Sequence, residues 1–132
     1  MSKLAIALLG CILAANALAD DTPARLTKDE LLSLLPGTKV THINQGGSER
    51  HWTNEADGTV VASSNNKIIG NALGTHFAQG RGTWRVDEEG KFCIDIDWSR
   101  LQEKWCSYIL RGQSDVYYLN VVDDKHKIVF AK

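Results

Sequence analysis

Alternating apolar and polar positions run through most of the chain after residue 38 and predict a series of short β-strands. Turn-forming stretches such as "ADG" at 56–58 and "DEEG" at 87–90 separate them. We predict eight strands, at Lys39–Asn44, Glu49–Asn54, Thr59–Ser64, Gly82–Asp87, Lys91–Asp97, Glu103–Leu110, Asp115–Val122 and Lys127–Ala131. Short turns between them indicate an antiparallel meander that closes into a small barrel or half-barrel. The predicted fold class is mainly β with one N-terminal helix.

That helix is predicted at about 28–35, within "RLTKDELLSLLPG". Thr27 at the N-cap and Glu30 three residues later have the spacing of a capping box, and Pro36 with Gly37 ends the helix. Its leucines would cover one apolar surface of the domain, for example an open end of the barrel. A role at a membrane surface is the alternative, but the segment has too few basic residues to favour it.

The stretch "FCIDIDWSRLQEKWC" at 92–106 contains two cysteines on alternating segments. Folding it as a hairpin about Ser99 and Arg100 gives three sensible cross-strand pairs. They are Cys93 with Cys106, Ile94 with Trp105, and Asp95 with Lys104. We therefore predict a structural disulfide between Cys93 and Cys106. It closes a loop for which chain entropy predicts a stabilisation of about 3 kcal/mol.

The N-terminal 19 residues have the layout of a secretory signal peptide. Lys3 precedes an apolar run, and the small-residue triplet Ala17, Leu18, Ala19 suggests cleavage after Ala19. The expected location is periplasmic or secreted, an oxidising compartment in which paired cysteines form disulfides. In the alternative, "LLGC" at 8–11 is a lipoprotein box, and Cys11 is lipidated and anchors the protein to a membrane.

Cleavage would leave residues 20–132 as a single secreted domain. Of the 15 basic and 16 acidic residues only Lys3 lies in the leader, so the domain would have 14 basic and 16 acidic residues. The sequence has no basic block interleaved with aromatics, so a nucleic-acid partner is not expected.

The order of several short motifs resembles the bacterial domain-of-unknown-function 995 family of small secreted β proteins. They are "LLPGTKV", "ADGTV", "GRGTWRVDEEGKFCIDIDW" and "KWCSYIL", and together they extend over most of the domain. The "GTW" at 82–84 is also similar to the G-x-W motif of lipocalins and avidins, although it lies in mid-chain. The resemblance implies a secreted, barrel-like fold of lipocalin- or avidin-like architecture. It implies no established activity and no catalytic residues.

Candidate sites for chemistry are few. The four histidines are scattered without metal-binding spacing, and neither a nucleophile elbow nor a phosphate-binding glycine loop occurs in the sequence. Asp95 and Asp97 could form an acid–base pair, but alternate acids beside a lysine are typical of a solvated strand face. We therefore expect no enzyme activity, no metal and no cofactor.

Two functions of different kinds remain open. The first is a non-catalytic binding module that holds a small apolar or amphipathic molecule in the mouth of the barrel, with Trp52, Trp84 and Arg81 as candidate lining residues. Packing in the core is the alternative role for the tryptophans. The second function is that of an envelope or inhibitor-like protein, with a solid barrel that docks another protein. An empty cavity with convergent polar groups would favour the first, and a filled interior with an exposed apolar patch the second.

Overall fold

The computed structural model describes residues 24–44, 46–65 and 78–132. The expected leader at 1–19, the cleavage point after Ala19 and the alternative lipid attachment at Cys11 lie outside the described residues.

One helix and nine strands make up the described part of the chain, and all neighbouring strands are antiparallel. Along the sheet the strand order is β6-β5-β4-β3-β2-β1-β9-β8-β7. The elements are α1 (Lys28–Leu34), β1 (Lys39–Ile43), β2 (Glu49–Asn54), β3 (Thr59–Ser64), β4 (Ala78–Val86), β5 (Phe92–Asp97), β6 (Gln102–Ser107), β7 (Ile109–Arg111), β8 (Val116–Leu119), the 3₁₀ turn η1 (Asp124–His126) and β9 (Lys127–Ala131).

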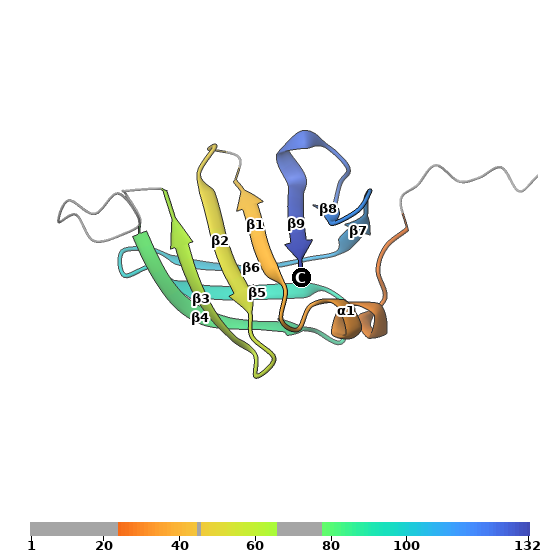
Figure 1. Cartoon of the computed structure of the whole chain (residues 1–132), viewed down its shortest axis with the longest axis horizontal. Helices are drawn as coiled ribbons and strands as arrows, with labels where there is room; N and C mark the ends of the chain where they lie inside the picture. The colour runs from red at the N-terminus through yellow and green to blue at the C-terminus, as the bar shows by residue number, and fades with distance from the viewer. Residues whose placement is uncertain (1–23, 45, 66–77) are drawn as a thin grey trace, which may run out of the picture.

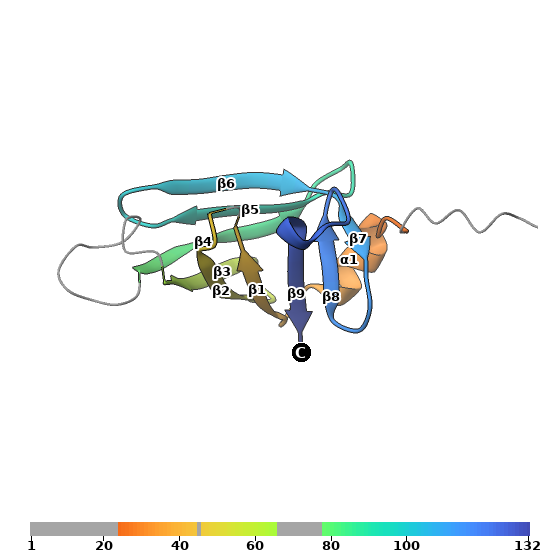
Figure 2. The ribbon, with the colours of Figure 1, turned by 90° about the horizontal axis from the view of Figure 1, so that it is seen from above.

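This single sheet curls into a nearly closed barrel. In Figure 1, β1, β2, β3 and β9 lie in front of β5 and β6, which cross behind them. Figure 2 shows the two layers from above, with α1 at one end. The predicted fold class, mainly β with one helix in a barrel-like meander, is confirmed.

The barrel does not close because β6 and β7, the two edges of the sheet, do not pair with each other in the described structure. The edge of β7 is covered by the segment before α1. The Leu26 amide donates to the Ile109 carbonyl (2.9 Å), and the Arg111 amide donates to the Ala24 carbonyl (3.0 Å). Among the described residues, only β5 pairs with β6.

A single asparagine joins the end of β6 to the end of β8. The Tyr108 amide donates to Asn120 Oδ1 (2.9 Å), and the Asn120 amide donates back to the Tyr108 carbonyl (2.9 Å). Asn120 has a φ of 61°, a left-handed conformation that asparagine tolerates better than most residues. The prediction of one strand over 103–110 is wrong here, because the chain leaves β6 at Tyr108 to start β7.

Helix α1 closes one end of the barrel, as the sequence predicts. The capping box is present, with Glu30 N donating to Thr27 Oγ1 (3.1 Å) and Thr27 N donating to Glu30 Oε1 (3.2 Å). Leu31 and Leu35 are fully buried against the barrel interior. No helix in the described residues is long and apolar enough to span a membrane.

The barrel axis is filled by large side chains. Most inward-facing positions of the strands contribute to one continuous core. Its largest fully buried members are Trp98, Phe92, Phe130, Leu31, Leu35, Ile94, Ile96, Ile109 and Ile128. These residues therefore form a packed core along the barrel axis.

The β5–β6 hairpin has the register that the alternation predicts. Ile94 lies opposite Trp105 and Asp95 opposite Lys104. Cys93 lies opposite Cys106, with the two sulfur atoms 2.08 Å apart. This bond connects the edge strand β6 to the rest of the sheet.

Two glycines on β4 allow the sheet to bend. A Cβ atom on Gly80 would lie 2.7 Å from Ile96 Cγ2 and 2.8 Å from Trp98 Cε3, and one on Gly82 would lie 1.7 Å from the Asp95 carbonyl oxygen. Only a residue without a side chain lets β5 and Trp98 come this close to β4.

We predict that Gly80→Ala destabilises the protein by about 1–3 kcal/mol, because the added methyl group overpacks the contact with Ile96 and Trp98. Urea denaturation would measure the change in the free energy of unfolding. Gly46→Ala is the control, because a Cβ there would meet only Asn44 Oδ1, at an ordinary 3.5 Å. Equal stability of the two variants would contradict the role assigned to Gly80.

A candidate binding site at the gap in the barrel

A pocket of about 220 Å³ opens where β6 and β1 diverge. We call it the side pocket. One wall is the second half of β6 and the other is formed by the end of β1 and the loop after β8. Its described lining residues are His42, Asn44, Trp105, Cys106, Ser107, Leu119, Asn120 and Lys125.

Behind the side pocket lies a group of polar and aromatic side chains, which we call the polar cluster: His42, Arg50, Trp98, Glu103 and Trp105. Glu103 is its centre because it projects into the barrel from β6. Its carboxylate accepts hydrogen bonds from the indole N–H groups of Trp98 (3.1 Å) and Trp105 (2.8 Å). These bonds satisfy a charge that would otherwise be costly to bury.

Arg50 supplies the positive charge from the opposite layer. It is the second residue of β2, and its Nε lies against Glu103 Oε1. The two side chains are only 5% and 11% exposed, so solvent screens this ion pair poorly. The guanidinium also lies 5.8 Å from the Trp98 ring centroid, while its Nη1 makes no hydrogen bond to any described residue.

His42, the fourth residue of β1, connects the polar cluster to the side pocket. It is 8% exposed, and its ring lies 5.8 Å from that of Trp105 and 6.4 Å from that of Trp52. Its Nδ1 is buried without a hydrogen-bond partner among the described residues. Burial is the main cause that lowers the pKa of His42, and the charge of Arg50 lowers it further, against an opposing effect of Glu103. His42 is therefore neutral at pH 7.

The side pocket thus combines an aromatic wall with polar groups that retain hydrogen-bonding capacity. Trp105 and Leu119 offer apolar contact, whereas neutral His42 and the amides of Asn44 and Asn120 offer polar contact. Such a combination suits a small molecule with an apolar part and a polar part.

The three residues proposed from the sequence do not share one surface. Trp52 and Trp84 are buried in the core, and their indole N–H groups donate to Asn54 Oδ1 (3.0 Å) and to the Glu55 carbonyl (2.7 Å). Arg81 lies on the opposite face of β4, exposed, where it lines an outer pocket of about 350 Å³. Of these three, only Trp52 contacts the polar cluster, through the ring of His42.

Sequence reasoning missed Arg50, Glu103 and His42. The alternation in β5 and β6 did contain a signal for Glu103, because the register that pairs Ile94 with Trp105 also places Glu103 opposite Ile96, on the apolar face. No local pattern indicates Arg50, which is 53 positions from its partner in the sequence.

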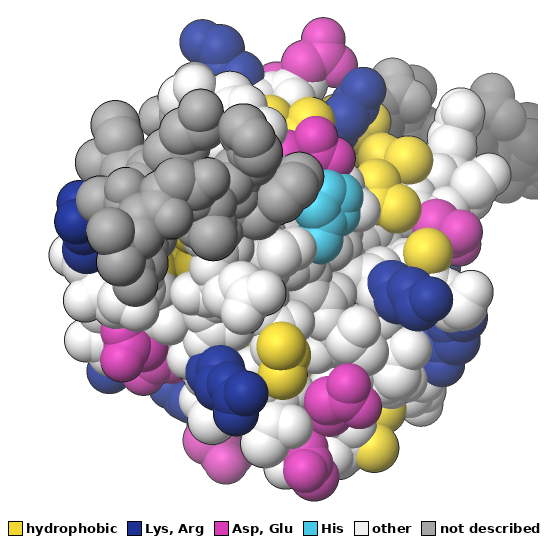
Figure 3. Space-filling view, turned by 60° about the vertical axis from the view of Figure 1, so that its left-hand side comes forward, with side chains coloured by type: hydrophobic (Ala, Val, Ile, Leu, Met, Phe, Trp, Pro, Cys, Tyr) yellow, Lys and Arg dark blue, Asp and Glu magenta, His cyan; other side chains and the backbone are white. Residues whose placement is uncertain are grey.

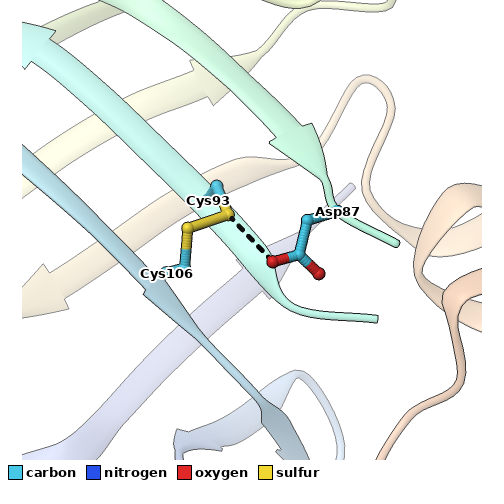
Figure 4. Close-up of side chains that lie close together, drawn as sticks. All are labelled: Asp87, Cys93 and Cys106. Atoms are coloured by element: carbon cyan, nitrogen blue, oxygen red, sulfur yellow. Dashed lines mark hydrogen bonds between the residues drawn. A yellow bond between two sulfur atoms is a disulfide. The ribbon is translucent and has the colours of Figure 1, made fainter. Parts of the chain in front are cut away.

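The disulfide lies on the outer side of β5 and β6, close to the carboxylate of Asp87 (Figure 4). Asp87 Oδ2 is 3.8 Å from Cys93 Sγ, and the three residues could together surround a metal ion. Zinc or another soft metal requires free thiolates, which two sulfur atoms bonded to each other do not supply. This group is therefore not a metal site while the disulfide is intact.

Asp95 and Asp97 have ordinary structural partners. Asp95 Oδ1 accepts from Gln102 Nε2 (2.8 Å), and Asp97 Oδ1 accepts from the Ser99 amide in the hairpin turn (2.9 Å). On the face shown in Figure 3, acidic and basic side chains alternate and hydrophobic ones form small patches.

The sequence model of the family described as "protein of unknown function (DUF995)" matches residues 6–107. The chain belongs to this family. The DUF995 match includes the polar cluster and both cysteines of the disulfide, and it ends at the last residue of β6. The side pocket therefore lies between the matched region and β8 and η1, which follow it in the sequence. No curated protein matches the chain.

We predict that Glu103→Gln destabilises the protein by about 3–5 kcal/mol, because the charge of Arg50 stays buried without a partner. Glutamine keeps an acceptor oxygen for the two indole N–H groups, so the loss of stability reports mainly on the removal of the negative charge. Chemical denaturation would measure it, with Glu88→Gln on a fully exposed side chain as the control. Adding Arg50→Met should restore most of the loss, and failure of that rescue would contradict the pairing.

We also predict that His42 makes stability fall on acidification. The pKa of His42 is lowered in the folded protein, so the unfolded chain binds its proton first as the pH falls. The stability that neutral His42 contributes to the folded protein is fully present above the ordinary histidine pKa, roughly 6.5, and is lost as the pH falls below it. His42→Phe should therefore flatten the pH dependence of the free energy of unfolding between about pH 7.5 and pH 5. Parallel curves for wild type and His42→Phe would contradict this prediction.

Proposed function

We propose that the protein is a non-catalytic binding module, secreted or periplasmic, that holds a small amphipathic molecule in the side pocket. The observation that carries the proposal is the pocket itself, at the gap in the barrel: an aromatic wall lies beside a buried histidine whose Nδ1 has no hydrogen-bond partner among the described residues. Unpartnered buried polar groups are costly unless a bound molecule or water satisfies them.

The filled axis changes where the ligand is expected. The mouth of the barrel is blocked at one end by α1, and the core residues occupy the interior. The gap beside β6 is the place where a molecule can reach His42 and Trp105 from solvent. At about 220 Å³ the side pocket is smaller than the roughly 300–1,000 Å³ of drug-sized ligand sites, so the ligand is small or projects outward.

The proposed compartment rests on two supports. The apolar leader predicted at 1–19 is typical of secretion, and the cysteine pair at disulfide distance suits an oxidising environment.

The test is native mass spectrometry of protein purified from the periplasm of its producing cells. We expect the wild-type protein to carry the added mass of a bound small molecule. Trp105→Ala, which removes the aromatic wall, should lack this added mass. Trp105→Phe should retain the ligand, because the aromatic contact remains. Arg81→Ala, beside the outer pocket, is the matched control and should also retain it.

Circular dichroism would establish that each variant is folded. A wild-type protein that carries no small molecule but retains a second protein would contradict the proposal and favour the alternative of a solid barrel that docks a protein partner.

A further inference from the structure

We propose that the side pocket selects an anionic head group, a carboxylate or a phosphate monoester, on the amphipathic molecule that it holds. This inference rests on the proposed function and adds the charge of the ligand. It follows from the hydrogen-bonding state of the polar residues that line the pocket.

The two asparagines of the side pocket present donors. Asn44 Oδ1 already accepts from the Ser48 amide (2.9 Å), and Asn120 Oδ1 from the Tyr108 amide (2.9 Å). Neither amide nitrogen donates to another described residue, so both N–H₂ groups are available. A ligand that meets these groups must offer acceptor oxygens.

Lys125 adds a positive charge that no described residue neutralises. The two acids that directly precede it in the sequence have other partners: Asp123 pairs with His126, and Asp124 Oδ1 lies 3.2 Å from Lys127 Nζ. The hydrogen bond from His126 is the main cause that lowers the pKa of Asp123, so this carboxylate is ionised and occupied.

No acidic residue is among the described lining of the side pocket. The one carboxylate directly behind it, Glu103, is already bound by Arg50 and two indoles. The pocket therefore offers an ammonium group and two amide donors without a competing carboxylate, which is the arrangement that binds an anion.

The apolar side of the pocket requires the rest of the molecule to be hydrophobic. Trp105 and the nine-tenths buried Leu119 face the same space as Lys125. A simple inorganic anion would leave this wall without a partner, whereas a short alkyl chain covers it.

The experiment is an NMR titration that follows the Trp105 indole N–H signal as eight-carbon probes are added at pH 7.4. The probes are octanoate, octyl phosphate, 1-octanol and octylammonium, which share one chain and differ in charge. We expect either anion or both to bind about fivefold more tightly than octanol, the upper end of what one partly exposed charge pair contributes, and octylammonium to bind most weakly.

Lys125→Met should abolish the preference for the anions, so that octanoate, octyl phosphate and octanol bind with similar affinities. Lys127→Met is the matched control, because this lysine pairs with Asp124 and is not among the described lining residues, and it should keep the preference. Octanoate alone would identify a carboxylate ligand, and octyl phosphate alone a phosphate.

The two proposals fail differently. If octanol binds as tightly as either anion in this titration, the site binds amphipathic molecules and the proposed selectivity for an anion is contradicted. If none of the four probes shifts it, the side pocket is not a binding site and both proposals fall.

Discussion

The ion pair between Arg50 and Glu103 is the constraint around which this barrel is organised. It joins the edge strand β6 to β2 in the opposite layer, across the interior rather than along the sheet. A buried pair of this kind contributes little net stability compared with apolar packing, but it is highly specific, because either charge alone is very unfavourable. The two indole donors fix the carboxylate in place, so the position of β6 depends on satisfying one charged group.

Beside this ion pair the sheet stops short of closing, because β6 and β7 do not pair with each other in the described structure. Hydrogen bonds between neighbouring strands would close a barrel, but here β6 meets the C-terminal strands only at its end, through the reciprocal bonds of Tyr108 and Asn120. Along the rest of β6 the inward side chains, rather than the backbone, span the distance to the other layer. Part of that distance is left open and becomes the side pocket, with His42 and Trp105 belonging both to the ion-pair surroundings and to the opening.

Local patterns in the sequence were sufficient for the elements and for one long-range contact. Thr27 and Glu30 determined the start of α1, and apolar alternation determined the register that brings Cys93 to Cys106, because a one-residue slip would turn every side chain to the wrong face. The break at Tyr108 was not predictable, since the apolar pattern continues across it and only a distant asparagine interrupts the strand. The candidate site was missed for a similar reason: Glu103 and Trp105 of β6 meet Arg50 and His42 through the curling of the sheet, and no spacing in the chain records that curling.

The bond between Cys93 and Cys106 also has a consequence for how the molecule avoids misassembly. Edge strands are the elements that detach most readily and insert into a second copy, either by exchange of the strand between two chains or by growth of a continuous intermolecular sheet. β6 is such an edge, and its cross-link to β5 means that it cannot leave without taking its neighbour along. Exchange would then require separation of β5 from β4 as well, over six paired residues. The cross-link thereby imposes a kinetic barrier to exchange of β6 between two copies of the chain.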